Sequence, residues 1–529
     1  MPRTLFCYLL LLFIFHWDQY KVFWWAHPKH TSLGRAEHDA NREHLFIYSS
    51  FIYDRRPPAN FSGLGKVQLV VLFLADKFHR TSDRMQCVVT KNAISVQKMA
   101  LQKELIHSLG ICALDLFVLT CSLDGLRRDS ALFDGGAAYR NMYSLALTDV
   151  DWYRMQRKST KLTLYPRQPS YKPRGLVLCM SRVFLFEKWQ LLITALETYR
   201  LFKLFNGYLI FEFLVDLVVA YVQSALLAVF ELMKAYEQHG LLQVRPGIRF
   251  PHQRGMPWDP NAETEFNGQI LLAHDCFYEY RESAQFIGLI DWDDLLVPSV
   301  HFGTLPEAFA AAFTVNPDTA YFLVNKLEAS FEEQPVTRPT RFNLRKLLTH
   351  GIRTAEMYND EKMVVRPKAL RGFWMHNSFN LETMKRAVKM FTNYTILLHL
   401  ANEERVNPNE FQMPFMTKFD IDDMHLHASR LLKKLNKSSR AFKLPTAQPF
   451  YAALVACHSQ IFAYFKSTDM NKSRCLSYSL CVLPTLPEAI CAVSRSVFGT
   501  VVTKGAKAVL HVRERSEFTQ DKCSDEGGL

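Results

Sequence analysis

The sequence predicts an α/β protein with a Rossmann-like, mostly parallel sheet. From residue 175 to residue 298, apolar runs of strand length alternate with segments whose apolar residues recur at helical spacing, a pattern typical of parallel sheets. Three carboxylates, Asp291, Asp293 and Asp294, directly follow one of the apolar runs, at the place where open α/β sheets hold ligands. With 529 residues, 49% of them apolar and 22% charged, the chain is long enough for two or three packed domains.

The first 44 residues predict a membrane anchor and a short stem. An uncharged run at 5–15 follows Arg3. The run is shorter than the ~20 residues of a typical spanning helix and is similar in size to the apolar part of a secretion signal. Aromatic residues after it suit a membrane interface. We therefore expect an uncleaved signal anchor at 1–26, with a cleaved signal peptide as the alternative, and a stem at 27–44 leading to a lumenal domain.

Cysteines and glycosylation sequons agree with a lumenal location. Ten cysteines remain beyond Cys7, and none of them shows the C-x-x-C spacing of a zinc site. Disulfide bonds in an oxidising compartment are expected for some of them. Cys179 and Cys276 lie in expected core elements and are equally compatible with free, buried thiols. The acceptor sequons are at Asn60, Asn393, Asn436 and Asn471.

The order of elements after the stem follows from the hydrophobic pattern. Residues 45–170 mix strand-like runs such as 67–73 with irregular polar stretches, which indicates a small accessory region rich in strands. The segments beyond it predict strands at 175–179, 208–213, 241–244 and 286–290, helices at 185–205, 218–239 and 267–280, and a closing segment at 295–298.

One stretch of this region, 205–233, is apolar enough to suggest a second spanning helix. Glu212 and Asp216 lie near its middle, and a charged side chain there costs a few kcal/mol in a bilayer. We therefore interpret this stretch as a buried strand followed by a helix.

The acidic tetrapeptide 291–294 predicts a metal site. Like charges side by side repel and raise each other's pKa, so a strand that ends in three carboxylates gains from a bound cation. Carboxylate oxygens suit Mg²⁺ or Mn²⁺, which complete their shells with water and substrate phosphates. The Asp-x-Asp pattern thus indicates a nucleotide diphosphate site. The alternative is an acidic turn or a helix N-cap that binds nothing.

The segment 274–298, HDCFYEYRESAQFIGLIDWDDLLVP, resembles the core signature of glycosyltransferase family 92. In that signature an Asp-x-Asp-[Asp/Glu] box precedes a leucine or isoleucine and a proline. Other segments resemble further parts of the family in the same order, so that the resemblance covers roughly residues 45–400. These segments are 46–56, 177–189, 236–242 and 362–376.

The resemblance implies a glycosyltransferase of the GT-A class in the Golgi or endoplasmic-reticulum membrane, single-pass and type II, with its catalytic domain at 171–400 and a flanking or completing region at 401–529. It implies transfer of a hexose, with galactose as the best guess, from a UDP-sugar to a glycan acceptor. The cofactor implied is Mn²⁺ or Mg²⁺, held by Asp291, Asp293 and His376. The nucleotide sugar is expected to contact Asp291, Asp293 and Asp294, although Asp294 is alternatively a partner that holds the metal site in place.

No spacing argument selects a catalytic base, and Glu332 and Glu333 are weak candidates. One departure from the family concerns His399, because Leu400 and Ala401 follow it where the family has tyrosine and arginine. This departure motivates the alternative of a glycan-binding protein without activity. A metal-dependent phosphohydrolase is a third interpretation, but it usually requires more histidines or a second acidic cluster.

The charge of the chain does not indicate nucleic acid. The net charge is +12, and a basic excess is compatible with nucleic acid, anionic membranes or phosphate-bearing substrates. The densest basic run, 433–440, has no RNA-binding or helix-turn-helix pattern around it and is interpreted as a solvated helix face. The expected partners are therefore the UDP-sugar, the glycan acceptor and the membrane through the N-terminal segment.

Overall fold

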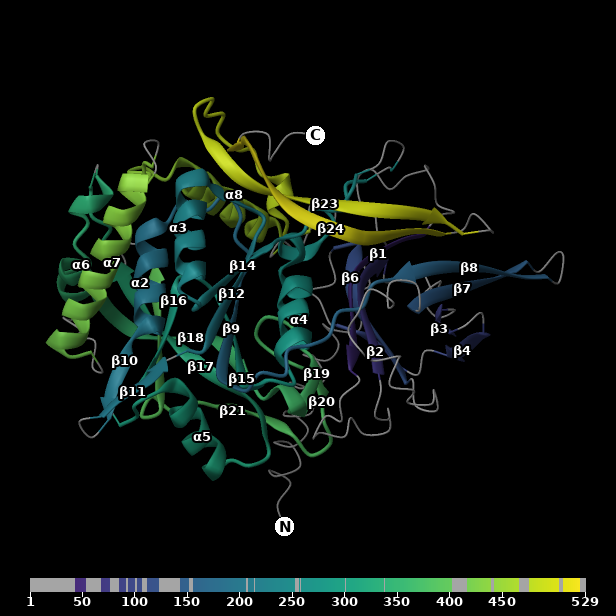
Figure 1. Cartoon of the computed structure of the whole chain (residues 1–529), viewed down its shortest axis with the longest axis horizontal. Coiled ribbons are helices and arrows are strands. Elements are labelled where there is room, and N and C mark those ends of the chain that lie inside the picture. Colours follow the sequence, from purple (N-terminus) through teal and green to yellow (C-terminus); the bar gives the residue numbers. More distant parts are fainter. Residues whose placement is uncertain are drawn as a thin grey trace, which may run out of the picture.

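The computed structural model describes the following residues, and all structural statements refer to them: 43–53, 68–76, 85–91, 94–99, 102–106, 112–122, 143–151, 156–205, 208–213, 215–252, 256, 258–299, 301–336, 338–401, 416–438, 442–465, 475–503 and 508–523. Two sheets lie side by side in this structure, and one helix, α4 (Gln269–Tyr280), lies between them (Figure 1). The expected anchor at 1–26 and nearly all of the stem lie outside the described residues.

The central sheet consists of β9 (Arg174–Met180), β12 (Leu217–Val222), β14 (Leu242–Pro246), β15 (Ala284–Ile290), β16 (Asp294–Pro298), β17 (Thr319–Phe331), β18 (Ile352–Val365), β21 (Arg386–Lys389) and β22 (Thr395–Ala401). The strand order is β14-β12-β9-β15-β18-β17-β22-β16, with β21 beside β17. The first four strands, β14, β12, β9 and β15, are parallel to one another. Strand β18 runs antiparallel to both β15 and β17, β17 is parallel to β22 and β21, and β16 is antiparallel to β22. The predicted class is confirmed as mixed α/β with a mostly parallel central sheet.

Both faces of this sheet are buried, as the alternation along β9 shows. Leu176, Leu178 and Met180 belong to one hydrophobic core, whereas Val177 and Cys179 belong to another. A fully apolar strand is expected where helices or sheets cover both faces. The first core is shared with α2 (Trp189–Arg200), α3 (Leu227–Gln238), α5 (Leu305–Val315), α6 (Leu344–His350) and α7 (Lys418–Ser438), and the second with α4 and the other sheet.

The second sheet joins the two ends of the chain. It contains β1 (Glu43–Tyr53), β2 (Gln68–Asp76), β5 (Gln102–Leu105), β6 (Leu114–Ser122), β13 (Ser224–Leu226), β23 (Ile490–Val502) and β24 (Ala508–Lys522), in the order β13-β23-β24-β1-β2-β6-β5. Strand β1 is parallel to β24, and the long β23–β24 hairpin crosses the top of Figure 1 in yellow.

The remaining elements are small. A four-stranded sheet has the order β4 (Ile94–Met99), β3 (Met85–Lys91), β7 (Tyr143–Asp151), β8 (Gln156–Leu164). Two pairs of short strands are β10 (Phe202–Phe205) with β11 (Tyr208–Phe213), and β19 (Leu370–Gly372) with β20 (Asn380–Leu381). The other helical segments are η4 (Glu265–Gly268), η5 (Pro339–Arg341), η6 (Pro367–Ala369), α8 (Pro449–Phe465) and η7 (Tyr478–Leu480).

Most elements predicted between 175 and 298 are present, with one clear correction. The expected helix at 218–239 begins as the strand β12 and becomes helical only at Leu227. The run LVVAYV of β12 is fully buried between β9 and β14, and a short apolar run cannot be assigned to strand or helix by its periodicity alone. The expected helix at 185–205 is limited to α2, and the strand at 208–213 pairs with β10 outside the central sheet. No helix of the described ranges is long and apolar enough to cross a membrane.

The ten cysteines of the described residues form five disulfides: Cys87–Cys121, Cys112–Cys475, Cys179–Cys276, Cys457–Cys481 and Cys491–Cys523. Cys179 and Cys276 are therefore bonded to each other and are not free thiols. Their disulfide joins β9 to α4. Five disulfides indicate a chain that folds in the oxidising secretory pathway.

Candidate functional site

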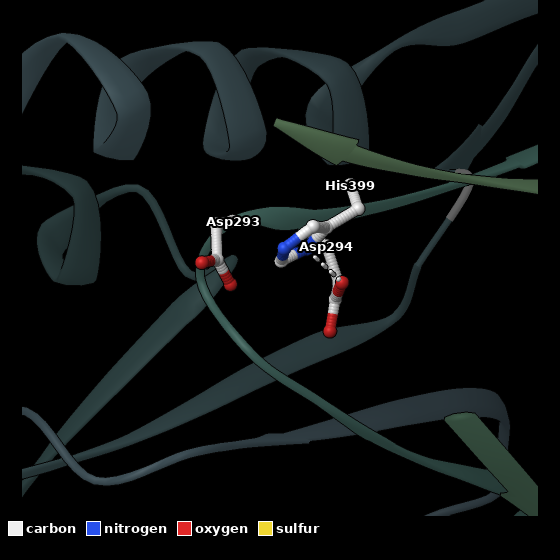
Figure 2. Close-up of side chains that lie close together, drawn as sticks. All are labelled: Asp293, Asp294 and His399. Carbon is white, nitrogen blue, oxygen red and sulfur yellow. Dashed lines mark hydrogen bonds and ion pairs between the residues drawn. The ribbon is translucent and has the colours of Figure 1, made fainter. Parts of the chain in front are cut away.

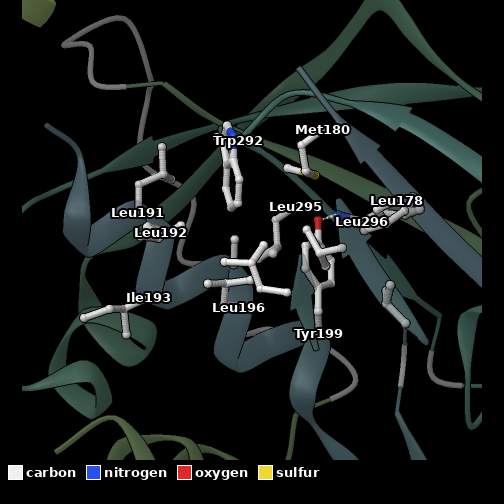
Figure 3. Packing of buried hydrophobic residues seen from close by; sticks show 14 of the residues in the cluster. Leu178, Met180, Leu191, Leu192, Ile193, Leu196, Tyr199, Trp292, Leu295 and Leu296 are labelled. Carbon is white, nitrogen blue, oxygen red and sulfur yellow. Dashed lines mark hydrogen bonds between the residues drawn. The ribbon is translucent and has the colours of Figure 1, made fainter. Parts of the chain in front are cut away.

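The acidic tetrapeptide forms a tight turn between β15 and β16. The backbone N–H of Asp294 donates to the carbonyl of Asp291 (3.2 Å), and the Asp294 carboxylate accepts the N–H of Asp291 in return (3.3 Å). Trp292 lies between the acids in the sequence, is only 5% exposed and belongs to the first hydrophobic core, the one shared with α2. Figure 3 shows its ring near Leu191 and Met180. The buried indole thus anchors the turn and fixes the acids at the carboxyl edge of the parallel strands.

Asp294 is buried, and both of its oxygens have partners. Oδ1 lies 2.9 Å from His399 Nδ1 and 3.6 Å from Lys326 Nζ, and Oδ2 lies 3.4 Å from Lys362 Nζ. Burial alone would raise the pKa of this carboxyl, but Lys362 and the hydrogen bond from His399 outweigh it and hold the pKa well below its usual range. Asp294 is therefore ionised and serves as the internal support of the turn.

Asp291 pairs with the same lysine. Its Oδ2 accepts a hydrogen bond from Lys362 Nζ (2.5 Å), and its Oδ1 lies 3.4 Å from Gln269 Nε2 at the start of α4. Burial raises the pKa of Asp291, but the attraction of Lys362 exceeds this effect, so that the pKa is lowered overall. Lys362 thus neutralises part of the negative charge of the turn, which the sequence analysis had assigned to a bound metal alone.

Asp293 differs from its neighbours because its carboxylate has no hydrogen-bond or ion-pair partner among the described side chains. Its carbonyl accepts the N–H of Leu400 (2.6 Å), which fixes the backbone while leaving the side chain free. Burial and the charge of Asp294 raise the pKa of Asp293. A carboxyl in this state is stabilised by an arriving cation.

His399 completes a group of three possible ligands with Asp293 and Asp294, whose ligand atoms all lie within 4.8 Å of one another (Figure 2). Because an ionised carboxylate only accepts hydrogen bonds, the contact with Asp294 requires His399 Nδ1 to carry the proton. In the neutral ring this leaves the lone pair on Nε2. Burial lowers the pKa of His399, but Asp294 and Asp293 outweigh it and raise the pKa overall, so that a metal would have to displace a proton from the charged ring. A carboxylate that orients a histidine in this way is the usual support of a metal ligand, and the carboxylate–imidazole set of Asp293 and His399 fits Mn²⁺ or a similar divalent ion.

Not every predicted ligand joins this group. The Nδ1 atom of His376 lies 2.7 Å from the carbonyl of Glu361, and its ring lies against Trp374 (centroids 5.6 Å apart). His376 is outside the three-residue ligand group of the described residues. His399 took no ligand role in the sequence prediction, although it is the one ionisable residue in the strand TILLHLA and lies opposite Asp294 in the pairing of β22 with β16.

The departure after His399 lies in the core. Leu400, where the resemblance led us to expect a tyrosine, is 1% exposed and belongs to the first hydrophobic core, the one shared with α2. The change at this position therefore fills a core position and adds nothing to the polar part of the site.

The two proposed bases occupy different surroundings. Glu332 is exposed. Glu333 accepts a hydrogen bond from Gln448 on one oxygen (2.5 Å), while its Oε1 is buried without a described partner. Burial lowers the pKa of Lys188, and both Glu333 and Asp293 oppose this effect, so Lys188 lies within electrostatic reach of both acids. Of the two glutamates, Glu333 is the one that acts on Lys188, on which Asp293 also acts.

A cavity of about 450 Å³ lies elsewhere, between the two sheets. Its lining includes Arg167, Tyr221, Arg245 and Asp275 but no residue of the acidic turn. Asp275 pairs with Arg167, and Glu279, next to the cavity, pairs with both arginines, so these two acids and two arginines balance one another. We interpret it as a polar seam between the sheets.

A sequence model of the family described as glycosyltransferase family 92 matches residues 174–437, which include the acidic turn, His399 and both glutamates. The chain belongs to this family. Three Caenorhabditis elegans proteins, each named a glycosyltransferase family 92 protein, are similar to it. They are 27%, 25% and 24% identical over 63%, 57% and 60% of this chain. The matches span 65%, 60% and 63% of the lengths of those relatives, which is less than two thirds of each.

Proposed function

We propose that this protein is a GT-A glycosyltransferase that transfers a hexose, with galactose the first candidate, from a UDP-sugar to a glycan acceptor with a divalent metal. The observation that carries the proposal is the free carboxylate of Asp293 beside the oriented imidazole of His399, at the carboxyl edge of the parallel strands in a family 92 chain. Ligands of open α/β sheets bind at this edge.

Each residue of the turn has a separate task in this proposal. Asp293 and His399 would hold the metal, and Asp294 would keep His399 in the tautomer that leaves Nε2 for the ion. Asp291, held by Lys362, faces the nucleotide or the water shell of the ion. When bound, Mn²⁺ or Mg²⁺ acts as a Lewis acid on the departing diphosphate. His376 stays a proposed further ligand on the strength of the family resemblance; its Nδ1 lies 2.7 Å from the carbonyl of Glu361.

Glu333 is the proposed base for the acceptor hydroxyl. Its buried, unpaired Oε1 can accept a proton, and its second oxygen is fixed by Gln448. General bases are commonly carboxylates held in this manner near the reacting group. Glu332 lacks these features because it is exposed.

We further propose a type II location in the Golgi or endoplasmic-reticulum membrane. The five disulfides agree with a lumenal catalytic part, and the sequon residues Asn393 and Asn436 are exposed. We expect N-glycans on the expressed protein. Endoglycosidase treatment that leaves its gel mobility unchanged, together with a cytosolic location, would contradict this.

The test of the function is incubation of the purified lumenal part with a panel of nucleotide sugars and Mn²⁺ or Mg²⁺, with and without glycan acceptors. We expect release of nucleoside diphosphate from one donor, increased by an acceptor. A protein that binds glycans but neither binds nor cleaves any nucleotide sugar would support the non-enzymatic glycan-binding alternative and end the transferase proposal.

The metal ligand is tested by comparing His399→Gln with His376→Gln. Loss of a residue that only supports a metal ligand typically weakens metal binding by roughly 10- to 100-fold, and we expect His399→Gln to weaken it at least this much in a Mn²⁺ titration. An equal loss for His376→Gln would make it a ligand as well. Unchanged Mn²⁺ affinity of His399→Gln would remove His399 from the site.

A further inference from the structure

Two buried cations lie in the segment between β9 and α2, next to the acidic turn. Arg182 is 8% exposed and Lys188 is 3% exposed. Asp291 acts electrostatically on Arg182, and Asp293 acts on Lys188. The N–H of Ser181, next to Arg182, donates to the carbonyl of Ile290 (2.9 Å), so this segment starts beside the turn in which the proposed metal ligands lie.

Lys188 is held by an aromatic ring and not by an acid. Its Nζ lies 3.7 Å from the centroid of Tyr451, and no described carboxylate forms an ion pair with it. Burial lowers the pKa of Lys188, although Glu333 and Asp293 act in the opposite direction. Among the described residues, the ammonium group of Lys188 thus has no carboxylate within ion-pair distance.

Arg182 has a closely similar environment. Its guanidinium lies 4.4 Å from the centroid of the Tyr478 ring, and its Nε donates to the carbonyl of Phe266. Among the described residues it has no carboxylate partner, and burial lowers its pKa against the opposing effects of Tyr478 and Asp291. Apart from these contacts and a hydrogen bond to the Tyr478 side chain, the remaining donors of the guanidinium are left for another acceptor.

A buried cation without a counter-ion is expensive to maintain, because a charge removed from water needs a paired charge and hydrogen bonds. An aromatic face compensates only partly for this loss. Two such cations beside one acidic turn indicate a place for an anion that arrives with the substrate. A diphosphate meets this requirement, since it has oxygens for both cations and for a metal on the acids.

The two tyrosines come from the C-terminal segment, beyond the part of the chain that the family model matches. The N–H of Tyr451 donates to Glu187 Oε2 (2.9 Å), and the N–H of Tyr478 donates to Asn267 Oδ1 (2.7 Å). The disulfides Cys457–Cys481 and Cys112–Cys475 fix the same segment. Both rings are therefore held firmly against the cations.

We propose that Arg182 and Lys188 bind the diphosphate of the nucleotide sugar, and that Tyr478 and Tyr451 position them from the C-terminal segment. This inference rests on the proposed function, because it assigns further residues to the donor site. It makes the C-terminal segment a part of that site, although neither tyrosine needs to touch the substrate.

The test is calorimetric titration with UDP, UMP and uridine in the presence of Mn²⁺. We expect Arg182→Gln and Lys188→Gln each to weaken UDP binding at least tenfold, to weaken UMP binding less, and to leave uridine binding unchanged. Lys234→Gln is the control, because it removes one positive charge from an exposed helix position where Lys234 pairs with Glu237. If both variants bind UDP as tightly as the control does, the inference is wrong.

The positioning role is tested by two matched pairs, Tyr451→Phe with Tyr451→Leu and Tyr478→Phe with Tyr478→Leu. Phenylalanine keeps the aromatic face, so we expect UDP affinity near that of the wild type, whereas leucine should lose several-fold and leave uridine binding unchanged. Equal UDP affinities of the phenylalanine and leucine variants in both pairs would exclude positioning by the rings. This test remains informative if Arg182→Gln or Lys188→Gln does not fold. A wild-type protein that binds no UDP with either metal would instead overturn the proposed function itself.

Discussion

The molecule contains two buried groups of charges that differ in how completely they are paired. One surrounds Asp275 on α4, at the junction of the two sheets. Asp275 pairs with Arg167, lies 3.8 Å from Arg245, and accepts a hydrogen bond from Tyr221 (2.7 Å). Glu279 neutralises the remaining charge of the arginines. Every acid in this group has a cation of its own.

The charges of the acidic turn are less completely paired than those around Asp275. Lys362 and His399 satisfy Asp291 and Asp294, but Asp293 has no described side-chain partner and Lys188 has no described counter-ion. Burial of charge is common to both groups, so it does not distinguish a functional site from a structural one. The unpaired charges distinguish the functional site, because a bound ligand would supply the partners that they lack.

The largest expected effect concerns the unpaired acid. Asp293→Asn keeps the shape of the turn but removes the charge that would hold the ion, so we expect transfer to fall about 1,000-fold, or about 4 kcal/mol of transition-state stabilisation. Folding should change little, because no described side chain depends on this carboxylate. Steady-state kinetics and a thermal melt on the same sample check both statements. Undiminished transfer would show that the unpaired acid is not functional.

Asp275→Asn is the matching change in the fully paired group around Asp275, and we expect it to lower the stability of the fold. Removing one partner of a buried pair leaves the other charge uncompensated, and here the partial exposure of Arg167 reduces the cost to about 3 kcal/mol of unfolding free energy. Chemical denaturation measures this loss. The comparison fails if the variant is as stable as the wild type but cannot bind the nucleotide.

Glu333→Gln tests whether the unpaired oxygen of Glu333 is the base. We expect about 100-fold slower transfer, a usual contribution of general base catalysis, with donor binding unchanged. Glu332→Gln is the control, since the neighbouring glutamate is exposed. Equal rates for the two variants would leave the base unassigned.

The smallest effect is a pH dependence of stability. His274 is fully buried next to Asp275, and its Nε2 accepts the N–H of Phe373 (3.2 Å). Burial lowers its pKa to about 4, from 6.5 in the unfolded chain. As pH falls below 6.5, the unfolded state binds the proton first, so stability should drop, by about 2 kcal/mol between pH 7.5 and pH 5. His274→Gln does not titrate, and denaturation curves at both pH values should show a smaller drop for it. An equal drop would assign the effect to other groups.

The sequence was informative where one segment carries the signal by itself. The strand at 286–290 followed by acids and the helix over 267–280 are local patterns, and both are present. The partners of the acids were not predicted, because Lys326, Lys362 and His399 are brought to the turn by strand pairing across more than thirty positions of sequence. The parallel pairing of β1 with β24 and the packing of Tyr451 on Lys188 join segments still farther apart, and no periodicity encodes such contacts.

The pairing of β1 with β24 also has a consequence for biosynthesis. Strand β1 starts at Glu43 and pairs from that residue with Ala508, so one of its edges stays open while nearly the whole chain is being translated. At about 5–20 residues per second, the wait is on the order of half a minute to a minute and a half. An open apolar strand edge is a template for aggregation during that time. Chaperone protection of the nascent chain is therefore needed longest around β1, and emergence of β24 from the ribosome is the event that ends this need.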